Sequence, residues 1–349
     1  MRRILFVITM AVLLVTGCDV HEWPDLPETV PFHLKLDYRT DMTMWPHSYV
    51  GENVAESRKG PDTASVRPYG TMRYIIRAYP FNVEKSVLES FTHEFILFKD
   101  IADGYNDELT ISLPPGSYSI MVWSDMQQDA SLPYFYNYSN FGEIALTGEY
   151  KGNDDWRDLF RGKGNITLVA DIMERLPDTL SLSMERPLAK YEFITTDIAA
   201  FVQKEITRAE AKSKADGVNF KGETKVNLED YRVEFQYVGF VPSTYSLYTD
   251  KVVDSFTGVA FNSRLKCLSD TTASLGFDYV FTNANVSSVT LQLIIYDKEG
   301  ICLSASEPIK VPIGRNQYTT VTGMLLMSEA KGGISVNPQY EGDHNLIFP

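Results

Sequence analysis

Three observations predict an all-β chain that folds as two β-sandwich domains, with one helix in the second. Apolar and polar residues alternate with a period of two in many short segments, which is the pattern of half-buried strands. Turn residues such as Pro114-Pro115-Gly116 and Asp103-Gly104 separate these segments at a spacing typical of sandwiches. The 349 residues are also long for a single core, so two domains are expected.

The N-terminal segment, residues 1–17, is predicted to be a signal peptide. Arg2 and Arg3 precede an apolar run from Ile4 to Val15, which is the order of a secretory signal. The run is too short to span a bilayer, which needs roughly 20 residues. Val15-Thr16-Gly17-Cys18 is similar to a bacterial lipobox, in which Cys18 is acylated and becomes the new N-terminus. An ordinary signal peptide that ends near a cysteine is the alternative.

Residues 18–29 are expected to form a lipid-attached tether. Pro24 and Pro27 keep this segment extended. Several acyl chains on Cys18 hold a protein on a membrane, because each buried methylene group contributes about 0.8 kcal/mol. No later stretch of the sequence is apolar enough to cross a membrane, so the lipid is the predicted membrane contact.

The chain is acidic, and this charge excludes one class of partner. It carries 32 basic and 46 acidic residues, and loss of the signal with Arg2 and Arg3 leaves 30 basic residues. Nucleic acid is not an expected partner, since its affinity depends on cationic neutralisation of phosphate. The same charge argues against electrostatic adhesion to anionic lipid.

The N-terminal sandwich domain is predicted over residues 30–186. Its first strand runs from Val30 to Tyr38, with Phe32, Leu34 and Leu36 on one face. Further strand candidates are MRYIIRAY, HEFILFK, ELTISL, SYSIMVW and TLSLSME. The stretch from Met44 to Gly70 is polar and rich in turn residues, so a long surface loop is expected there.

The C-terminal sandwich domain is predicted over residues 187–349. Its strand candidates after LAKYEFIT are YRVEFQY, FDYVFTN, VTLQLIIYD and YTTVTGMLL. A helix is predicted from Asp197, as the N-terminal cap, to about Lys214, because apolar residues recur there at helical spacing. We expect it to cross one end or face of the second sandwich, with Glu205 on its solvated side.

No sequence motif indicates catalysis, a metal or a cofactor. His93-Glu94 lacks the second histidine of the helical zinc motif, and Gly162-Lys163-Gly164 lacks the rest of a phosphate loop. No Gly-x-Ser-x-Gly elbow occurs. We therefore expect no enzyme activity, no catalytic residues, no metal and no cofactor.

The segment GNDDWRDLFRG, from Gly152 to Gly162, is the densest group of polar residues. Three of its aspartates offer calcium ligands, but their spacing does not match the calcium-loop pattern. Arg157 and Arg161 can neutralise these acids instead. A salt-bridged surface turn is the preferred interpretation.

An aromatic segment between Leu132 and Glu143 is the main candidate for ligand or partner contacts. Its rings offer large contact areas that stack on sugar faces or line a protein interface. The alternative is a long loop that folds its aromatic residues onto the sandwich edge. The candidate residues are Tyr134, Phe135, Tyr136, Tyr138 and Phe141.

Two cysteines remain after Cys18, and they pose the question of a disulfide. Cys267 and Cys302 lie in an exported region, where a bridge is permitted. A bridge would close a loop of about 35 residues and stabilise the fold by roughly 3–4 kcal/mol. Each cysteine also sits beside apolar residues, and free thiols are the preferred interpretation.

Three segments resemble a known family, the fimbrillin-like lipoproteins. LPPGSYSIMVWSD (Leu113–Asp125) is similar to a Pro-Gly-x-Tyr strand of their N-terminal domain, and MERPLAKYEFITTD (Met184–Asp197) is similar to their interdomain segment. EPIKVPIGRNQYTTVTGMLL (Glu307–Leu326) resembles a late strand pair with a Thr-rich second strand. The lipobox at Cys18 agrees with this resemblance, which covers nearly the whole mature chain.

The resemblance implies two transthyretin-like, Greek-key sandwich domains in a component of a type V, donor-strand pilus of the outer membrane. Members of the family serve as stalk, tip or membrane-anchor subunits. Stalk precursors lose their first strand to an arginine-specific protease, and a strand from a neighbouring subunit fills the gap. The resemblance contributes no catalytic residues, and partners by strand exchange are the other fimbrial subunits.

Arg39 follows the first strand directly and is the candidate site for such a protease. We expect the uncut form, since the acidic tether is suited to being kept. The predicted function is a fimbrial anchor or accessory subunit, lipid-anchored at the cell outer membrane and acting in assembly or adhesion. The alternative, which rests on the aromatic segment, is a glycan-binding outer-membrane lipoprotein of a polysaccharide-uptake system.

Overall fold

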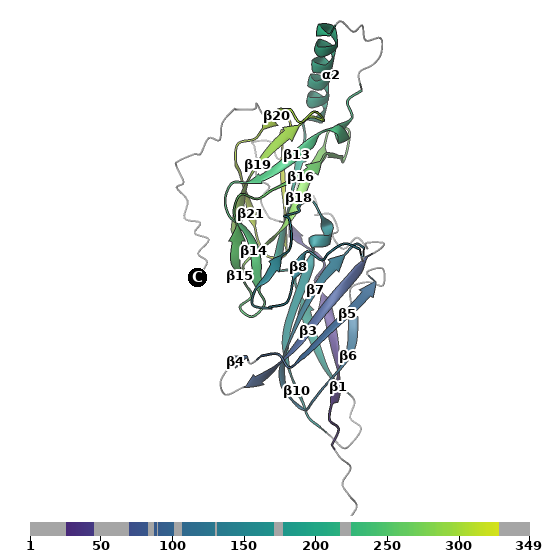
Figure 1. Ribbon diagram of the computed structural model, residues 1–349, viewed down its shortest axis with the longest axis vertical. Helices are drawn as coiled ribbons and strands as arrows, with labels where there is room; N and C mark the ends of the chain where they lie inside the picture. The colour runs from purple at the N-terminus through teal and green to yellow at the C-terminus, as the bar shows by residue number, and fades with distance from the viewer. Residues whose placement is uncertain are drawn as a thin grey trace, which may run out of the picture.

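The computed structural model describes eight parts of the chain and confirms the all-β prediction. The described residues are 26–44, 70–82, 87–88, 90–100, 107–129, 131–170, 177–216 and 225–327. The predicted signal peptide, Cys18 and most of the tether lie outside them, as does nearly all of the predicted loop after Met44. Two β-sandwiches are stacked along the long axis, with the N-terminal sandwich lower in Figure 1.

The N-terminal sandwich consists of two facing sheets. The first has the order β11 (Asp178–Met184), β1 (Val30–Tyr38), β6 (Asp107–Leu113). The second has the order β10 (Leu159–Leu168), β7 (Gly116–Gln127), β3 (Thr71–Asn82), β4 (Val87–Leu88), and β5 (His93–Asp100) also pairs with β3.

The predicted alternation of β1 is confirmed by its burial. Phe32, Leu34 and Leu36 are fully buried and face the second sheet, while Lys35 is exposed on the other side. β7 differs from this pattern because both of its faces are covered, so it is buried from Tyr118 to Met126. A strand covered on both faces loses the period of two and becomes almost continuously apolar.

The C-terminal sandwich also has two sheets. The first has the order β17 (Lys266–Cys267), β18 (Ala273–Phe281), β12 (Leu188–Thr195), β22 (Gln317–Gly323), β2 (Thr43–Met44). The second has the order β16 (Ala260–Arg264), β13 (Arg232–Tyr237), β19 (Ser287–Tyr296), β20 (Cys302–Ala305), and β21 (Ile309–Ile313) also pairs with β19. The 3-10 turn η3 (Leu228–Asp230) precedes β13.

A bulge in the first of these sheets depends on Gly276. The register of β12 against β18 shifts between Phe193 and Ile194, opposite this glycine. Gly276 has a φ of +144°, and a Cβ there would lie 2.7 Å from the Ser263 hydroxyl and 2.9 Å from the Phe235 ring. Only glycine both adopts this backbone conformation and leaves room for the facing sheet.

The predicted helix is confirmed as α2 (Ile198–Ala215). Ile198 and Phe201 anchor its first turns in the core, and its C-terminal part extends away from the end of the sandwich (Figure 1). Asp197 precedes the helix but makes no side-chain capping bond, which corrects the predicted role. Its carboxylate accepts the backbone N–H groups of Leu326 and Met327 instead, and so ties the end of the described chain to the helix start.

Glu205 is also not on a solvated face, contrary to the prediction. It is buried and accepts hydrogen bonds from the Tyr231 hydroxyl at 3.2 Å and from Arg208 at 3.3 Å. Arg208 in turn pairs with Asp297 at 3.1 Å, in the turn after β19. Helical spacing alone did not reveal that the first half of α2 packs against the second sandwich. Among the described residues, no helix is long and apolar enough to span a membrane.

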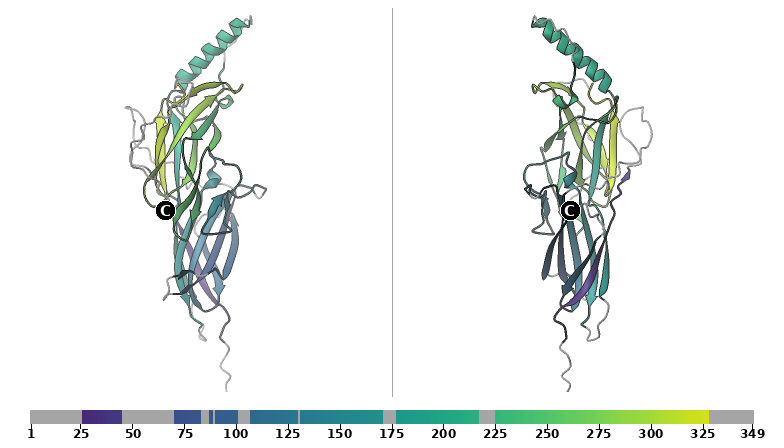
Figure 2. Two further views of the ribbon diagram at one scale, coloured as in Figure 1. Left: turned by 60° about the vertical axis from the view of Figure 1, so that its left-hand side comes forward. Right: turned by 90° about the vertical axis from the view of Figure 1, so that its right-hand side faces the viewer.

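A small fifth sheet joins the two sandwiches. Its order is β15 (Lys251–Phe256), β14 (Val241–Ser246), β9 (Ile144–Leu146), β8 (Tyr136–Asn137), with the 3-10 turn η2 (Asp155–Arg157) nearby in sequence. β2 likewise follows β1 in the chain but pairs with β22 of the second sandwich. Figure 2 shows β1 and β2 in purple passing from one sandwich to the other. The domain boundary at Arg186 stays a prediction. The short strands β2 and β9 lie before it in the chain but pair with strands that lie after it.

We predict that Leu34→Ala lowers the free energy of unfolding by about 2–5 kcal/mol, because it leaves a cavity beneath the central strand of a sheet. Lys35→Ala is the matched control, since its side chain is 53% exposed on the same strand, and it should change stability by less than about 0.5 kcal/mol. Urea unfolding of both variants measures the difference. Equal losses would contradict the assigned register of β1.

Candidate functional site

The first strand, β1, is the central strand of its sheet and is paired along both edges. It runs parallel to β11, with Leu34 opposite Leu180, and antiparallel to β6, with Leu34 also opposite Leu109. Its inward side chains fill the space between these neighbours. Removal of β1 would therefore leave an apolar groove whose two walls carry unpaired backbone groups.

Arg39, the candidate protease site, lies where β1 reaches the junction between the sandwiches. Its backbone N–H donates to the Met184 carbonyl at 3.0 Å and so continues the pairing with β11. Its side chain is 66% exposed and lies 3.4 Å from Glu185. The residue is thus displayed to solvent by its side chain while its backbone is engaged.

Arg186 is the buried residue that engages this backbone. Its guanidinium donates to the carbonyls of Arg39, at 3.2 Å, and of Thr40. Its other nitrogens form a two-pronged pair with the Asp158 carboxylate, at 2.7 and 3.0 Å. Arg186 and Asp158 are each about 1% exposed, so the pair is fully removed from water. A planar guanidinium suits this combination of a carboxylate and backbone carbonyls.

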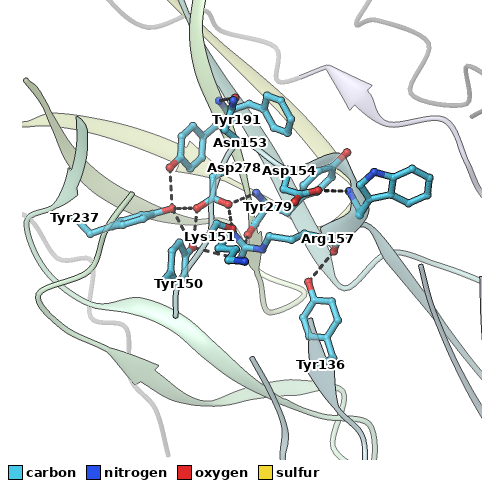
Figure 3. A network of polar contacts seen from close by, with 12 residues as sticks. Tyr136, Tyr150, Lys151, Asn153, Asp154, Arg157, Tyr191, Tyr237, Asp278 and Tyr279 are labelled. Atoms are coloured by element: carbon cyan, nitrogen blue, oxygen red, sulfur yellow. Dashed lines mark hydrogen bonds and ion pairs between the residues drawn. The ribbon is translucent and has the colours of Figure 1, made fainter. Parts of the chain in front are cut away.

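A second buried ion pair joins the two sandwiches directly (Figure 3). Arg157 lies just before β10 of the N-terminal sandwich and donates to Asp278 of β18 in the C-terminal one. The hydroxyls of Tyr150 and Tyr237 both donate to the same carboxylate at 2.6 Å. Arg157 also donates to the Tyr279 carbonyl at 2.9 Å. Its side chain and that of Asp278 are 3% and 0% exposed.

The tyrosines around Asp278 serve as neutral hydrogen-bond donors. Burial raises the pKa of Tyr150, Tyr191 and Tyr237, and the nearby Asp278 charge raises each further. Burial also raises the pKa of Asp278, while the charge of Arg157 and the tyrosine hydrogen bonds oppose that effect. Every polar atom of the carboxylate is used in these contacts, so the network favours structural support over proton transfer.

A third acidic residue, Asp250, receives an arginine from each sandwich. Arg161 of β10 contacts it at 2.8 Å, and Arg315, before β22, donates to its carboxylate and to its backbone carbonyl. Burial alone would raise the pKa of Asp250, but the hydrogen bonds from Tyr245 and Arg315 and the two arginine charges outweigh it and lower the pKa. Asp250 has a φ of +58°, a conformation that Asp and Asn tolerate.

The aromatic segment predicted for ligand contacts helps to build this junction. Tyr136 and Phe141 are buried, in a core cluster that also contains Tyr245 and Phe281 of the second sandwich. The Tyr136 hydroxyl donates to the Arg157 carbonyl at 2.7 Å. These two rings pack as the loop alternative expected.

The other three rings of the segment are half-buried. The guanidinium carbon of Arg73 lies 3.6 Å from the Tyr134 ring centre and 4.6 Å from that of Tyr138. Phe135 packs against the junction cluster. Burial raises the pKa of Tyr134 to about 12, partly offset by the Arg73 charge. Contact of these rings with a glycan or a protein stays a prediction.

The two cysteines are free thiols, and the bridge that the sequence left open is not formed. Cys267 lies on β17 and Cys302 on β20, which belong to different sheets of the second sandwich. Both thiols are exposed, although each cysteine sits beside apolar residues in the sequence. Among the described residues, no group of three or more His, Cys, Asp or Glu side chains is arranged to hold a metal ion.

The polar segment around Asp155 is not the surface turn that the sequence predicted. Arg157 and Asp158 are buried, and their partners are Asp278 and Arg186 rather than each other. Asp155 pairs with Lys190 at 2.8 Å. The charges match across the junction rather than within the segment.

Sequence reasoning missed Asp278 and Arg186 as the partners of this segment. The available signal was one charged residue in the apolar run GFDYVF, because charged residues are rarely buried without a partner.

Comparisons with known proteins place the chain in one family and find a distant similarity to several solved structures. A family model described as a family of unknown function, DUF6562, matches residues 28–349. No curated protein matches the chain.

Three solved structures illustrate the structural similarity. A candidate polysaccharide-binding protein (DUF1812) from Bacteroides thetaiotaomicron has 11% identity and a TM-score of 0.41, over 79% of each chain. The fimbrial anchor protein Mfa2 from Porphyromonas gingivalis has 12% identity and a TM-score of 0.32, over 79% of this chain and 82% of that one. A fimbrial assembly protein from Parabacteroides distasonis has 10% identity and a TM-score of 0.33, over 84% and 90%.

We predict that Asp278→Asn lowers the free energy of unfolding by about 3–5 kcal/mol, because it leaves Arg157 as an uncompensated buried charge. Asp270→Asn makes the same chemical change at an exposed position and should cost less than about 0.5 kcal/mol. Urea unfolding followed by circular dichroism compares the two. An Asp278→Asn protein as stable as the wild type would show that this ion pair does not stabilise the junction.

The lowered pKa of Asp250 predicts a pH-dependent contribution to stability. Its folded pKa lies below the ordinary 3.8, so its stabilisation is present above about pH 4 and is lost as the pH falls through the folded pKa. The thermal midpoint of the wild type should therefore exceed that of Asp250→Asn at pH 7, and the two should converge as the pH falls below about 4. A difference that stays constant over this range would contradict the prediction.

Proposed function

The chain belongs to DUF6562, a family of unknown function, and we propose that it is a non-enzymatic outer-membrane lipoprotein that serves as a fimbrial anchor or accessory subunit. The observation that carries the proposal is the place of β1. This strand begins at the end of the molecule far from the second sandwich and ends at the junction (Figure 1). A tether before Val30 would therefore enter the fold through the central strand of a sheet.

The free energy of burying its side chains favours a retained first strand. Burial of Phe32, Leu34 and Leu36 is worth roughly 1.5–3 kcal/mol for each side chain. Their sum is comparable with the net stability of a whole domain, about 5–15 kcal/mol. A chain that lost β1 would need a strand from another subunit to stay folded, whereas a chain that keeps β1 is closed and stays joined to its lipid.

The chemistry of the described residues supports a role in assembly rather than catalysis. Asp158 and Asp278 are buried, Asp250 is partly exposed, and each of the three is paired with arginine. Partners would be reached through strand edges and surfaces, because an exposed edge is a template for an added strand. The expected partners are other fimbrial subunits.

The proposal is tested on protein taken from intact cell envelopes. We expect labelled fatty acid on the wild type, none on Cys18→Ser, and an acylated peptide that continues unbroken past Arg39. A body that begins at Thr40 without an acylated peptide would overturn the anchor role and favour a polymerising stalk or tip subunit. Label that persists on Cys18→Ser would contradict the prediction that residues 15–18 are a lipobox.

A capture experiment from detergent-solubilised envelopes identifies the partners. Fimbrial subunits recovered with the wild type, identified by mass, are the expected result. A glycan array run in parallel tests the polysaccharide-uptake alternative. Affinity for a sugar that is lost on Tyr134→Ala and Tyr138→Ala, without co-purified fimbrial subunits, would favour that alternative.

A further inference from the structure

Three consecutive backbone carbonyls after β1 are held by side chains from elsewhere in the fold. Arg186 donates to the carbonyls of Arg39 and Thr40, and the Asn316 amide donates to that of Asp41 at 2.9 Å. Asn316 also accepts from Arg186 at 3.2 Å, so the two side chains form one unit. We call Arg186 and Asn316 the clamp.

Contacts outside residues 39–41 also hold Arg186 and Asn316 in position. Asp158 holds two nitrogens of Arg186, and the guanidinium carbon lies 4.5 Å from the Phe160 ring centre. Asn316 has a left-handed backbone, with a φ of 54°, and its N–H donates to the Leu188 carbonyl at 2.8 Å. Arg186 cannot turn away without leaving buried charges unpaired, and Asn316 would lose its side-chain hydrogen bonds to Arg186 and Asp41.

The chain on either side of the clamp is also held. The Arg39 N–H bonds to β11 on one side, and β2 pairs with β22 on the other. The clamp therefore spans the junction, since Arg186 follows β11 of the N-terminal sandwich and Asn316 precedes β22 of the second one. The segment cannot leave as a free strand while the two sandwiches stay together.

We propose that the clamp shields the Arg39–Thr40 bond from arginine-specific proteases and keeps β1 in the fold until the junction opens. This inference rests on the proposed role of the first strand and identifies what keeps that strand from being cut off. A protease needs the backbone on both sides of the bond free, so cleavage follows the population of the opened segment. The exposed Arg39 side chain offers the recognition element, and the clamp withholds the bond.

The test uses the lipidated protein purified in detergent and an arginine-specific endoprotease. Arg39 is the first arginine after Cys18, so release of a lipidated 18–39 peptide, followed by mass spectrometry, reports this cut alone. We expect the wild type to resist. Asn316→Gly, which keeps the left-handed backbone, should speed this cut at least tenfold, which equals 1.4 kcal/mol of easier opening.

Asn153→Gly is the matched control. Asn153 has the same left-handed backbone, with a φ of 55°, and lies at the junction, where its side chain accepts from the Phe277 N–H rather than contacting residues 39–41. It should leave the rate of cleavage at Arg39 within about twofold of wild type, because the clamp is untouched. Arg186→Lys should speed cleavage at Arg39 more than Asn316→Gly does. Thermal unfolding verifies that each variant is folded before digestion.

Two results would overturn the clamp. One is a wild type cut at Arg39 as fast as a synthetic peptide of residues 34–44. The other is an Asn316→Gly protein cut no faster than Asn153→Gly. Failure of the lipid anchor shows elsewhere, as fatty-acid label that is missing from Cys18 in envelopes. Unlipidated protein that still resists cleavage at Arg39 would then keep the clamp and lose only the anchor role.

Discussion

The contact between Arg157 and Asp278 is the interaction on which the arrangement of the two sandwiches depends. Removing both charges from water costs several kcal/mol for each ion, and only close pairing with further hydrogen bonds offsets that cost. Asp278 has these bonds from Tyr150 and Tyr237, and Arg157 has the Tyr279 carbonyl. Any rotation of one sandwich against the other would separate these groups, so the pair selects one relative orientation.

The other charged groups at the junction extend the same constraint. Asp250 binds an arginine from each sandwich, and Arg186 joins Asp158 to the chain that leaves β1. An apolar cluster that includes Trp123 of the first sandwich and Phe281 of the second also fills the junction. The junction is therefore an interior rather than a flexible linker, and the described parts of both sandwiches act as one body.

The local features of this fold were predictable from sequence, and the contacts of the junction were not. The alternation in β1 and the helical spacing after Asp197 depend on neighbouring residues, so both appear in a single segment. The Arg157–Asp278 pair joins positions 121 residues apart, and no local pattern reports that distance.

The same limit explains the corrections to single residues. The Asp197 carboxylate binds the N–H groups of residues 326 and 327, and Glu205 meets Tyr231 across the core. In both cases the sequence correctly placed the acidic residue at the start of the helix or within it. Its partner comes from a distant strand or turn, which only the assembled sandwich brings near.

The position of β1 connects the rigidity of the junction with the proposed anchoring. A pull on the tether would act along β1, in shear against the hydrogen bonds that join it to β11 and β6, so many bonds would resist it together. At the far end of the strand, Arg186 and the pairing of β2 with β22 pass the load to the second sandwich. A mobile junction would break this path at Arg39. Retention of the first strand and rigidity between the sandwiches are therefore one requirement, met by the same buried arginines.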